Sequence, residues 1–205
     1  DAGVITTQSL GGGALPQGNN DQVRIDVRNF GSTTLGGAGL GIGLTYAIES
    51  PINSGNIIFT SSTTTWTGTL LANQTFGTTG GAIIHPDSYS VPPGEFEICA
   101  WTTVTGDGDA TNDTNCVKAV GVPVIAIDYN TSYCDDFESG NVGWQSTVDP
   151  TGNPGSIWEL GAPNFGTTTG AYSGANAWDV NLGIGYSPNA YCVLTSPIFD
   201  FTNAV

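Results

Sequence analysis

Basic side chains are nearly absent from this 205-residue sequence. Arg24, Arg28 and Lys118 are its only Lys or Arg residues, and 18 carboxylates oppose them, so the formal net charge is −15. Phosphate groups of nucleic acids and anionic lipids are held by clusters of Lys and Arg. We therefore expect no nucleic-acid partner and no membrane partner, and calcium or another cationic surface fits this composition better.

Catalytic side chains are also scarce, with one histidine, one lysine and no methionine. General acid–base and Schiff-base mechanisms lack their usual parts in such a chain. His85 is close to Asp87 and Ser88 in sequence, but neighbours on an extended segment point to opposite faces, so we expect no triad. We interpret His85 as a loop residue, and we expect no enzymatic activity and no catalytic residues.

Long apolar runs are missing too. No stretch approaches the roughly 18 to 20 apolar residues of a membrane helix, and the N-terminus lacks the charged and apolar regions of a signal peptide. Because the sequence contains no methionine, Asp1 is not a translation start. We expect a processed form or a piece of a longer polypeptide, and we favour the piece.

The residues that are abundant favour strands and turns. The sequence has 30 Gly and 11 Pro, whereas Lys, Arg, Met and Glu, which favour helices, are few. Hydrophobic residues reach 39% and include five Trp, so a packed core is expected. The composition predicts an all-β protein.

The first half alternates as half-buried strands do. Apolar residues take every second position in residues 23–28, 44–48 and 96–102. About seven short strands separated by turn residues are typical of an immunoglobulin-like β-sandwich, which we place at residues 1–121.

Three motifs of this half carry a family resemblance. They are Asp1-Ala2-Gly3-Val4, the segment 23–31 (VRIDVRNFG), and the segment 93–100 (PGEFEICA) with its downstream loop, which contains Gly106-Asp107-Gly108-Asp109. Together they resemble the CARDB family of bacterial cell-adhesion-related, Ig-like domains.

The second half changes character at Tyr133, after a segment, 122–132, that we interpret as a linker; its residues 122–129 are alternatively the first strand of the next unit. The motifs DFESG (136–140), GW (143–144), WELG (158–161), SGANA (173–177) and TSPIFD (195–200) follow in order. This order is similar to the MAM-like jelly-roll modules, or choice-of-anchor J domains, of Bacteroidota surface proteins. The resemblance implies that 133–205 is the N-terminal part of such a module.

A complete module of this kind continues for about as long again beyond Val205. An incomplete jelly roll exposes an apolar face and an unpaired edge, which soluble proteins avoid. Either the chain is cut from a larger protein, or a neighbouring subunit supplies the missing strands by β-augmentation.

Four cysteines permit three pairings. Cys99 and Cys116 flank a polar loop and are expected to face each other across a hairpin, which leaves Cys134 to pair with Cys192. On the chain-entropy model the first bond stabilises by about 3 kcal/mol and the second by about 4 kcal/mol. Two disulfides indicate an extracellular compartment, whereas four reduced, buried thiols are the alternative.

Two groups of carboxylates are candidate calcium sites. Asp107, Asp109 and Asp113 place oxygen donors in one short loop, as calcium requires, although Asp-Gly pairs are also ordinary turn residues. By resemblance to the jelly-roll modules, Glu138 and Asp179 are the ligands of a second structural calcium. A polar strand end is the alternative there, and no other cofactor is expected.

Aromatic side chains are the remaining candidates for binding. Most of the tryptophans are expected in the cores, but Trp66 lies among threonines without an evident packing role. A flat ring with polar surroundings suits the face of a sugar, so Trp66 is a candidate for weak glycan binding.

These observations lead to one main hypothesis. The chain is expected to be a non-catalytic segment of a large extracellular multidomain protein, acting as a cell-surface adhesin or as a unit of an extracellular fibre. Its partners are then other copies of itself, neighbouring surface-protein domains or glycans, and the resemblance implies export by type IX secretion. The alternative is an ancillary region, binding carbohydrate or another substrate, of a secreted hydrolase or peptidase whose catalytic domain lies elsewhere.

Overall fold

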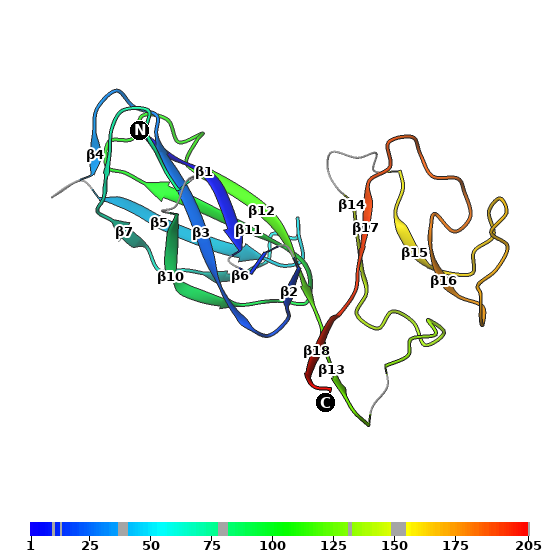
Figure 1. The fold of residues 1–205 in the computed structure, drawn as a ribbon. Coiled ribbons are helices and arrows are strands. Elements are labelled where there is room, and N and C mark those ends of the chain that lie inside the picture. Colours follow the sequence, from blue (N-terminus) through cyan, green and yellow to red (C-terminus); the bar gives the residue numbers. More distant parts are fainter. Residues whose placement is uncertain are drawn as a thin grey trace. The chain divides into compact units, whose positions relative to one another are not determined.

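The computed structural model describes residues 1–9, 11–12, 14–36, 41–77, 82–130, 133–148 and 155–204 (Figure 1). The regular secondary structure in these ranges consists of β-strands, which confirms the all-β prediction. Within them no helix is long and apolar enough to cross a membrane. Contacts divide the chain into two compact units, unit 1 (Asp1–Gly121) and unit 2 (Val122–Val205).

Unit 1 contains two main sheets, and the long strands of each sheet pair in an antiparallel arrangement. The first sheet has the order β1 (Ala2–Ser9), β3 (Asn20–Asn29), β10 (Ile83–Ser90), with β9 (Thr75–Phe76) pairing β3. The second has the order β2 (Ala14–Pro16), β12 (Thr114–Val122), β11 (Gly94–Thr103), β5 (Ile42–Glu49), β6 (Ile57–Thr60), with β7 (Thr64–Trp66) pairing β5. A short ribbon joins β4 (Leu35–Gly36) to β8 (Thr69–Leu70).

The two sheets share one core, as the alternating pattern predicts. Val23, Ile25 and Val27 on β3 are fully buried, and so are Phe96 and Ile98 on β11. Residues between them on each strand point away from this core, because side chains alternate across a strand. Unit 1 is therefore a β-sandwich.

Strand β5 departs from simple alternation, because seven of its eight residues are buried. Thr63 covers its outer face, with its Oγ1 2.9 Å from Oγ1 of Thr45. A Cβ added at Gly43 would lie 3.2 Å from Cγ2 of Thr63, so this face accepts only small side chains. Small residues on a strand flanked by β11 on one side and by β6 and β7 on the other are therefore buried where alternation predicts exposure.

The described part of unit 2 contains three two-stranded ribbons joined by irregular segments. Strands β13 (Val124–Asp128) and β18 (Ile198–Asn203) are parallel. Strands β14 (Gln145–Val148) and β17 (Cys192–Thr195) are antiparallel, as are β15 (Trp158–Gly161) and β16 (Ala177–Val180). Strand β13 occupies much of the segment that the sequence suggested as a linker, and its pairing with β18 makes it part of unit 2.

The described part of unit 2 has little apolar burial. Val122, at its first position, is its only buried hydrophobic residue there, whereas unit 1 holds the whole core cluster. Two-stranded ribbons alone are marginally stable in water and need a packed face. The jelly-roll assignment of 133–205 stays a prediction, since these ribbons are not joined into two packed sheets.

Candidate functional site

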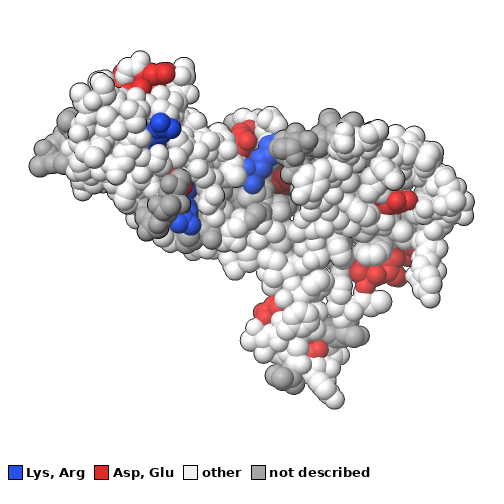
Figure 2. Space-filling model, turned by 45° about the horizontal axis from the view of Figure 1, so that its top comes forward, with Lys and Arg blue, Asp and Glu red and all other residues white. Residues whose placement is uncertain are grey.

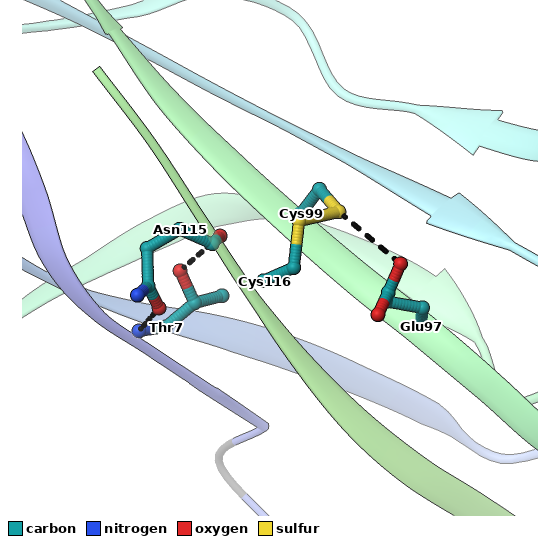
Figure 3. The surroundings of a disulfide bond; sticks show 5 residues. All are labelled: Thr7, Glu97, Cys99, Asn115 and Cys116. Carbon is teal, nitrogen blue, oxygen red and sulfur yellow. Dashed lines mark hydrogen bonds between the residues drawn. A yellow bond between two sulfur atoms is a disulfide. The ribbon is translucent and has the colours of Figure 1, made fainter. Parts of the chain in front are cut away.

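The predicted disulfide between Cys99 and Cys116 is formed (Figure 3). The two residues are direct cross-strand partners on β11 and β12, with their Cα atoms 4.1 Å apart. Glu97 precedes Cys99 on the same face of β11, and its Oε2 lies 3.8 Å from Cys99 Sγ (Figure 3). The bond thus pins the hairpin on the side of the sheet that faces away from the core.

The predicted bond between Cys134 and Cys192 is not formed, and both residues are free thiols. Cys134 is exposed in an irregular segment, whereas Cys192 begins β17 opposite Val148. The carbonyl of Cys192 also accepts a hydrogen bond from Nε1 of Trp158 at 3.4 Å. These contacts hold Cys192 in a ribbon to which the segment around Cys134 does not belong.

The first proposed calcium loop satisfies its carboxylates with its own hydrogen-bond donors. Oδ1 of Asp107 accepts the Asp109 N–H at 3.1 Å, and Oδ1 of Asp109 accepts both the N–H and the hydroxyl of Thr111. Oδ1 of Asp113 accepts the hydroxyl of Thr102 at 3.1 Å. Bonds of this kind are what Asx turns make without a metal.

The surroundings of Asp113 disfavour the charged form of its carboxylate. Burial raises its pKa above the ordinary 3.8, and the nearby carboxylates of Asp107 and Asp109 raise it further. The pKa of Asp109 is lowered instead by its two bonds to Thr111. The loop therefore concentrates negative charge at one edge of unit 1.

The two residues of the second proposed calcium site have separate structural roles. Oε1 of Glu138 accepts the N–H groups of Ala175 at 2.9 Å and Asn176 at 2.7 Å. A Cβ at Gly174 would lie 2.4 Å from that oxygen, so the loop closes tightly on Glu138. Asp179 lies on β16, and its Oδ1 accepts the N–H of Val180 at 2.8 Å.

Within the described residues, neither proposed calcium site gathers three ligand atoms in one place. The one such group joins Glu97 to Cys99 and Cys116, whose sulfurs are bonded to each other, so it is a disulfide environment. Calcium at Asp107, Asp109 and Asp113, or at Glu138 and Asp179, therefore stays a prediction from the sequence.

His85 is not a loop residue, contrary to the interpretation from the sequence. It lies on β10, is fully buried, and packs edge-on against Tyr46 with ring centroids 4.9 Å apart. Its Nδ1 accepts the N–H of Asp87 at 3.1 Å, and its Nε2 lies 3.3 Å from the carbonyl oxygen of Leu44. The ring is thus a hydrogen-bonded member of the core and is closed to substrate.

Trp66, the proposed sugar-binding residue, is a packing residue. It is half-buried against the core cluster, and its ring centroid is 5.0 Å from that of Phe76. A Cβ at Gly68 would come within 2.0 Å of the indole, so the ring lies on that backbone. The Thr-rich surroundings concealed both contacts, and glycan binding by the half-buried Trp66 stays a prediction from the sequence.

Two adjoining hollows in unit 2 form a candidate site lined by aromatic side chains. The first has a volume of about 290 Å³. Its lining residues are Trp158, Val180, Tyr186, Ala190, Tyr191 and Cys192. The second has a volume of about 130 Å³ and shares Val180 and Tyr186 with the first. Its other lining residues are Phe165, Thr168, Asp179, Asn181, Ile184 and Gly185.

Buried polar side chains hold the loop that separates these hollows. Asn181 is 5% exposed, accepts the Ile157 N–H on Oδ1 at 3.1 Å, and donates from Nδ2 to the Gly155 carbonyl at 3.1 Å. Oγ of Ser156, which is fully buried, accepts the Ser187 N–H at 2.8 Å. These bonds tie both ends of the loop to residues 155–157, so Tyr186 is presented from a fixed backbone although its side chain is 74% exposed.

The electrostatic character of unit 2 is uniform. Residues 122–205 contain eight carboxylates and no Lys, Arg or His. Figure 2 shows how sparse basic atoms are on the face that it draws. Glu159 on β15 and Asp179 on β16 are direct cross-strand partners, an arrangement in which like charges repel. Asp179 is a lining residue of the second hollow and its Oδ1 accepts the Val180 N–H, while Oε2 of Glu159 accepts the Leu182 N–H at 3.0 Å.

The sequence interpretation missed these hollows. It assigned Trp158 to the core and passed over the loop from Gly183 to Tyr191. A signal was present, because two tyrosines stand in this Gly- and Pro-containing stretch, which is unsuited to a buried strand.

Comparison with known proteins finds a likeness among solved structures. Neither a family model nor a curated protein matches the chain. A solved structure that is similar to it is the CARDB domain of a Pyrococcus furiosus protein in complex with di-metal ions, with a TM-score of 0.39 and 13% sequence identity. The match covers 60% of this chain and 94% of that one. It bears the name of the family that residues 1–121 resemble.

Proposed function

We propose that this chain is a non-catalytic segment of a large extracellular multidomain protein and acts as a cell-surface adhesin or as a unit of an extracellular fibre. The observation that carries the proposal is the exposure of aromatic and aliphatic side chains on unit 2. Tyr129, Tyr172 and Tyr186 are each more than 70% exposed, and Ile184 and Phe201 more than 60%. Exposed apolar side chains that lie together mark a surface that contacts other molecules, and Ile184 and Tyr186 line the same hollow.

The disulfide of unit 1 supports an extracellular location. Cytosolic thiols are kept reduced, whereas a bond such as that between Cys99 and Cys116 persists in oxidising compartments. The shortage of Lys and Arg also leaves few sites for trypsin-like proteases, which suits an exposed protein. Export by type IX secretion from a Bacteroidota-like bacterium belongs to the same proposal.

The surroundings of the acid–base groups support a non-catalytic role. His85 is enclosed in the core, and Asp87 bonds Ser62 through its carboxylate. A general base must reach the proton that it removes, and the buried ring of His85 does not offer this.

A second candidate is favoured by the hollows of unit 2. Tyr186, Trp158 and Phe165 line concave surfaces, as ligand sites often require. An ancillary region of a secreted hydrolase or peptidase, which holds carbohydrate or another substrate for a catalytic domain elsewhere, fits this feature.

Cell-surface labelling of the native protein tests the proposal. Antibody to the 205-residue segment should label intact, unpermeabilised cells, and deletion of the segment should reduce attachment or fibre formation. In extracts prepared without reductant, alkylation should mark Cys134 and Cys192 but neither Cys99 nor Cys116. A protein found only inside cells with all four thiols free contradicts the proposal, whereas loss of a hydrolytic activity on deletion favours the second candidate.

A further inference from the structure

We propose that the two hollows of unit 2 bind an uncharged glycan, with one sugar ring against Tyr186 in the second hollow and the neighbouring sugar over Trp158 in the first. The inference rests on the proposed function, because it names the class of ligand that unit 2 holds when the chain acts as an adhesin. It places glycan binding on unit 2, apart from Trp66 on unit 1.

Aromatic rings with exposed faces line both hollows. Tyr186 belongs to the lining of both hollows and is largely exposed. Phe165 in the second hollow and Tyr191 in the first are about half exposed. Such rings offer a flat apolar surface with a polar edge, which suits the apolar face and the hydroxyl rim of a sugar ring. The aromatic lining is therefore placed to stack on sugars.

Polar atoms that lack partners lie beside these rings. Oδ1 of Asp179 accepts the Val180 N–H at 2.8 Å, and this bond fixes the carboxylate. Within the described part of the chain, Oδ2 of Asp179 and the hydroxyls of Thr168 and Tyr186 bond no protein group, and all three residues line the second hollow. A sugar hydroxyl both donates and accepts, so adjacent hydroxyls of one sugar are matched to a carboxylate oxygen and a protein hydroxyl.

The backbone around the second hollow is held without a ligand. The Phe165 ring lies on Gly185, where an added Cβ would be 3.1 Å from the ring. The buried Asn181 donates from Nδ2 to the Gly185 carbonyl at 3.5 Å, in addition to its bond to the Gly155 carbonyl. Because these contacts order the loop in advance, a ligand does not have to supply the free energy for ordering it.

Charge and backbone bonding separate a neutral glycan from other ligands. An acidic sugar would meet Asp179 in the second hollow, and residues 122–205 contain no Lys, Arg or His to attract it. An added polypeptide strand requires free backbone groups. Beyond β16, the N–H of Leu182 already bonds Glu159, and its carbonyl accepts the N–H of Asn164.

A glycan array probed with the intact 205-residue chain tests the proposal. The array carries neutral glycans together with matched glycans that differ by one sialic or uronic acid. We expect signals from neutral glycans and signals at least about threefold weaker from their acidic counterparts. Binding of the strongest neutral glycan, measured by calorimetry, should be the same in about 0.05 M and about 0.5 M NaCl, because salt screens only charged contacts.

Variants locate the binding within the chain. Y186A removes a stacking face and should weaken binding about fivefold or more, whereas Y186F keeps the ring and should weaken it less than about threefold. D179N should weaken binding about threefold, because a neutral amide accepts a weaker hydrogen bond than a carboxylate does. It should also narrow the difference between neutral and acidic glycans, which a folding defect alone does not do. The matched controls D136N and Y172A, outside both hollows, should leave binding within about twofold.

Three results overturn the inference. They are an array without signals from neutral glycans, equal weakening by Y186A and Y172A, and binding that W66F abolishes and Y186A leaves intact, which assigns the glycan to unit 1. Circular dichroism checks each fold, and D179N against D136N carries the test if Y186A does not fold. None of these results affects cell-surface labelling, so a failure here is distinguishable from a failure of the proposed function.

Discussion

Replacement of the cysteines tests the disulfide assignment and its energetic role together. The C99S/C116S double variant removes the bond between β11 and β12 and leaves the strand pairing otherwise possible. Because Cys99 is half-buried and Cys116 is exposed, Ser at these positions adds no unsatisfied polar group to the core. The effect therefore reports mainly the loss of the chain constraint.

The magnitude follows from the loop that the bond closes. Its ends are 17 residues apart in sequence. On the chain-entropy model a loop of this size contributes about 3 kcal/mol at 25 °C, because the bond restricts the unfolded chain. A bond between Cys134 and Cys192 closes a longer loop and contributes about 4 kcal/mol on the same model. The two double variants are thus expected to differ clearly.

Urea unfolding followed by circular dichroism measures the difference on the intact chain. C99S/C116S should lower the free energy of unfolding of unit 1 by about 3 kcal/mol, and reductant should do the same to the wild type and nothing further to the variant. C134S/C192S is the matched control and should change stability by less than about 0.5 kcal/mol. A loss near 4 kcal/mol in the control, or none in the first variant, would refute the assignment.

Three further substitutions probe unit 1. F96A removes a fully buried ring packed 5.9 Å from that of Tyr89 and should lower the free energy of unfolding in urea by about 3 to 5 kcal/mol. N29A removes a fully buried amide that donates to three backbone carbonyls and should lower the melting temperature, with a loss of at least about 2 kcal/mol. D87N replaces a carboxylate whose pKa is lowered from 3.8 by two hydrogen bonds from Ser62. The charged carboxylate therefore stabilises the folded state above pH 3.8, and this stabilisation is lost as the pH falls through the lower pKa of the folded state. When the free energy of unfolding is measured at falling pH, D87N should lose less stability over this range than the wild type does.

Local patterns were sufficient where a structural rule acts over a few residues. Alternation in 23–27 and 96–100 identified the core faces of β3 and β11, because adjacent side chains on a strand must point to opposite faces. Cys99 and Cys116 were paired correctly for a related reason. They flank one hairpin loop, so their approach requires no knowledge of the rest of the fold.

His85 was misjudged because its surroundings come from a distant part of the chain. Pro86 follows His85, and proline argues against a central strand. Strand β10, however, lies at the edge of its sheet, where proline is tolerated. Tyr46, which packs on His85, is far away in sequence and cannot be assigned to it from local spacing.

The second cysteine pair failed because it was assigned by elimination. Once Cys99 and Cys116 are paired, arithmetic leaves Cys134 and Cys192, but a disulfide requires their Cα atoms within about 7 Å. Sequence separation does not report that distance. The structure instead places Cys192 at the start of β17, where it lines the first hollow.

The hollows of unit 2 show why a binding surface is harder to predict than a core. A core strand repeats one chemical character at a fixed period, whereas Phe165, Asp179 and Tyr186 come from two loops and a strand with no common period. Asn181 braces its loop through hydrogen bonds to backbone groups of Gly155, Ile157 and Gly185, and the first two of these residues are 26 and 24 positions away in sequence. Such a site becomes recognisable only when burial of the bracing amide and exposure of the aromatic rings are seen together.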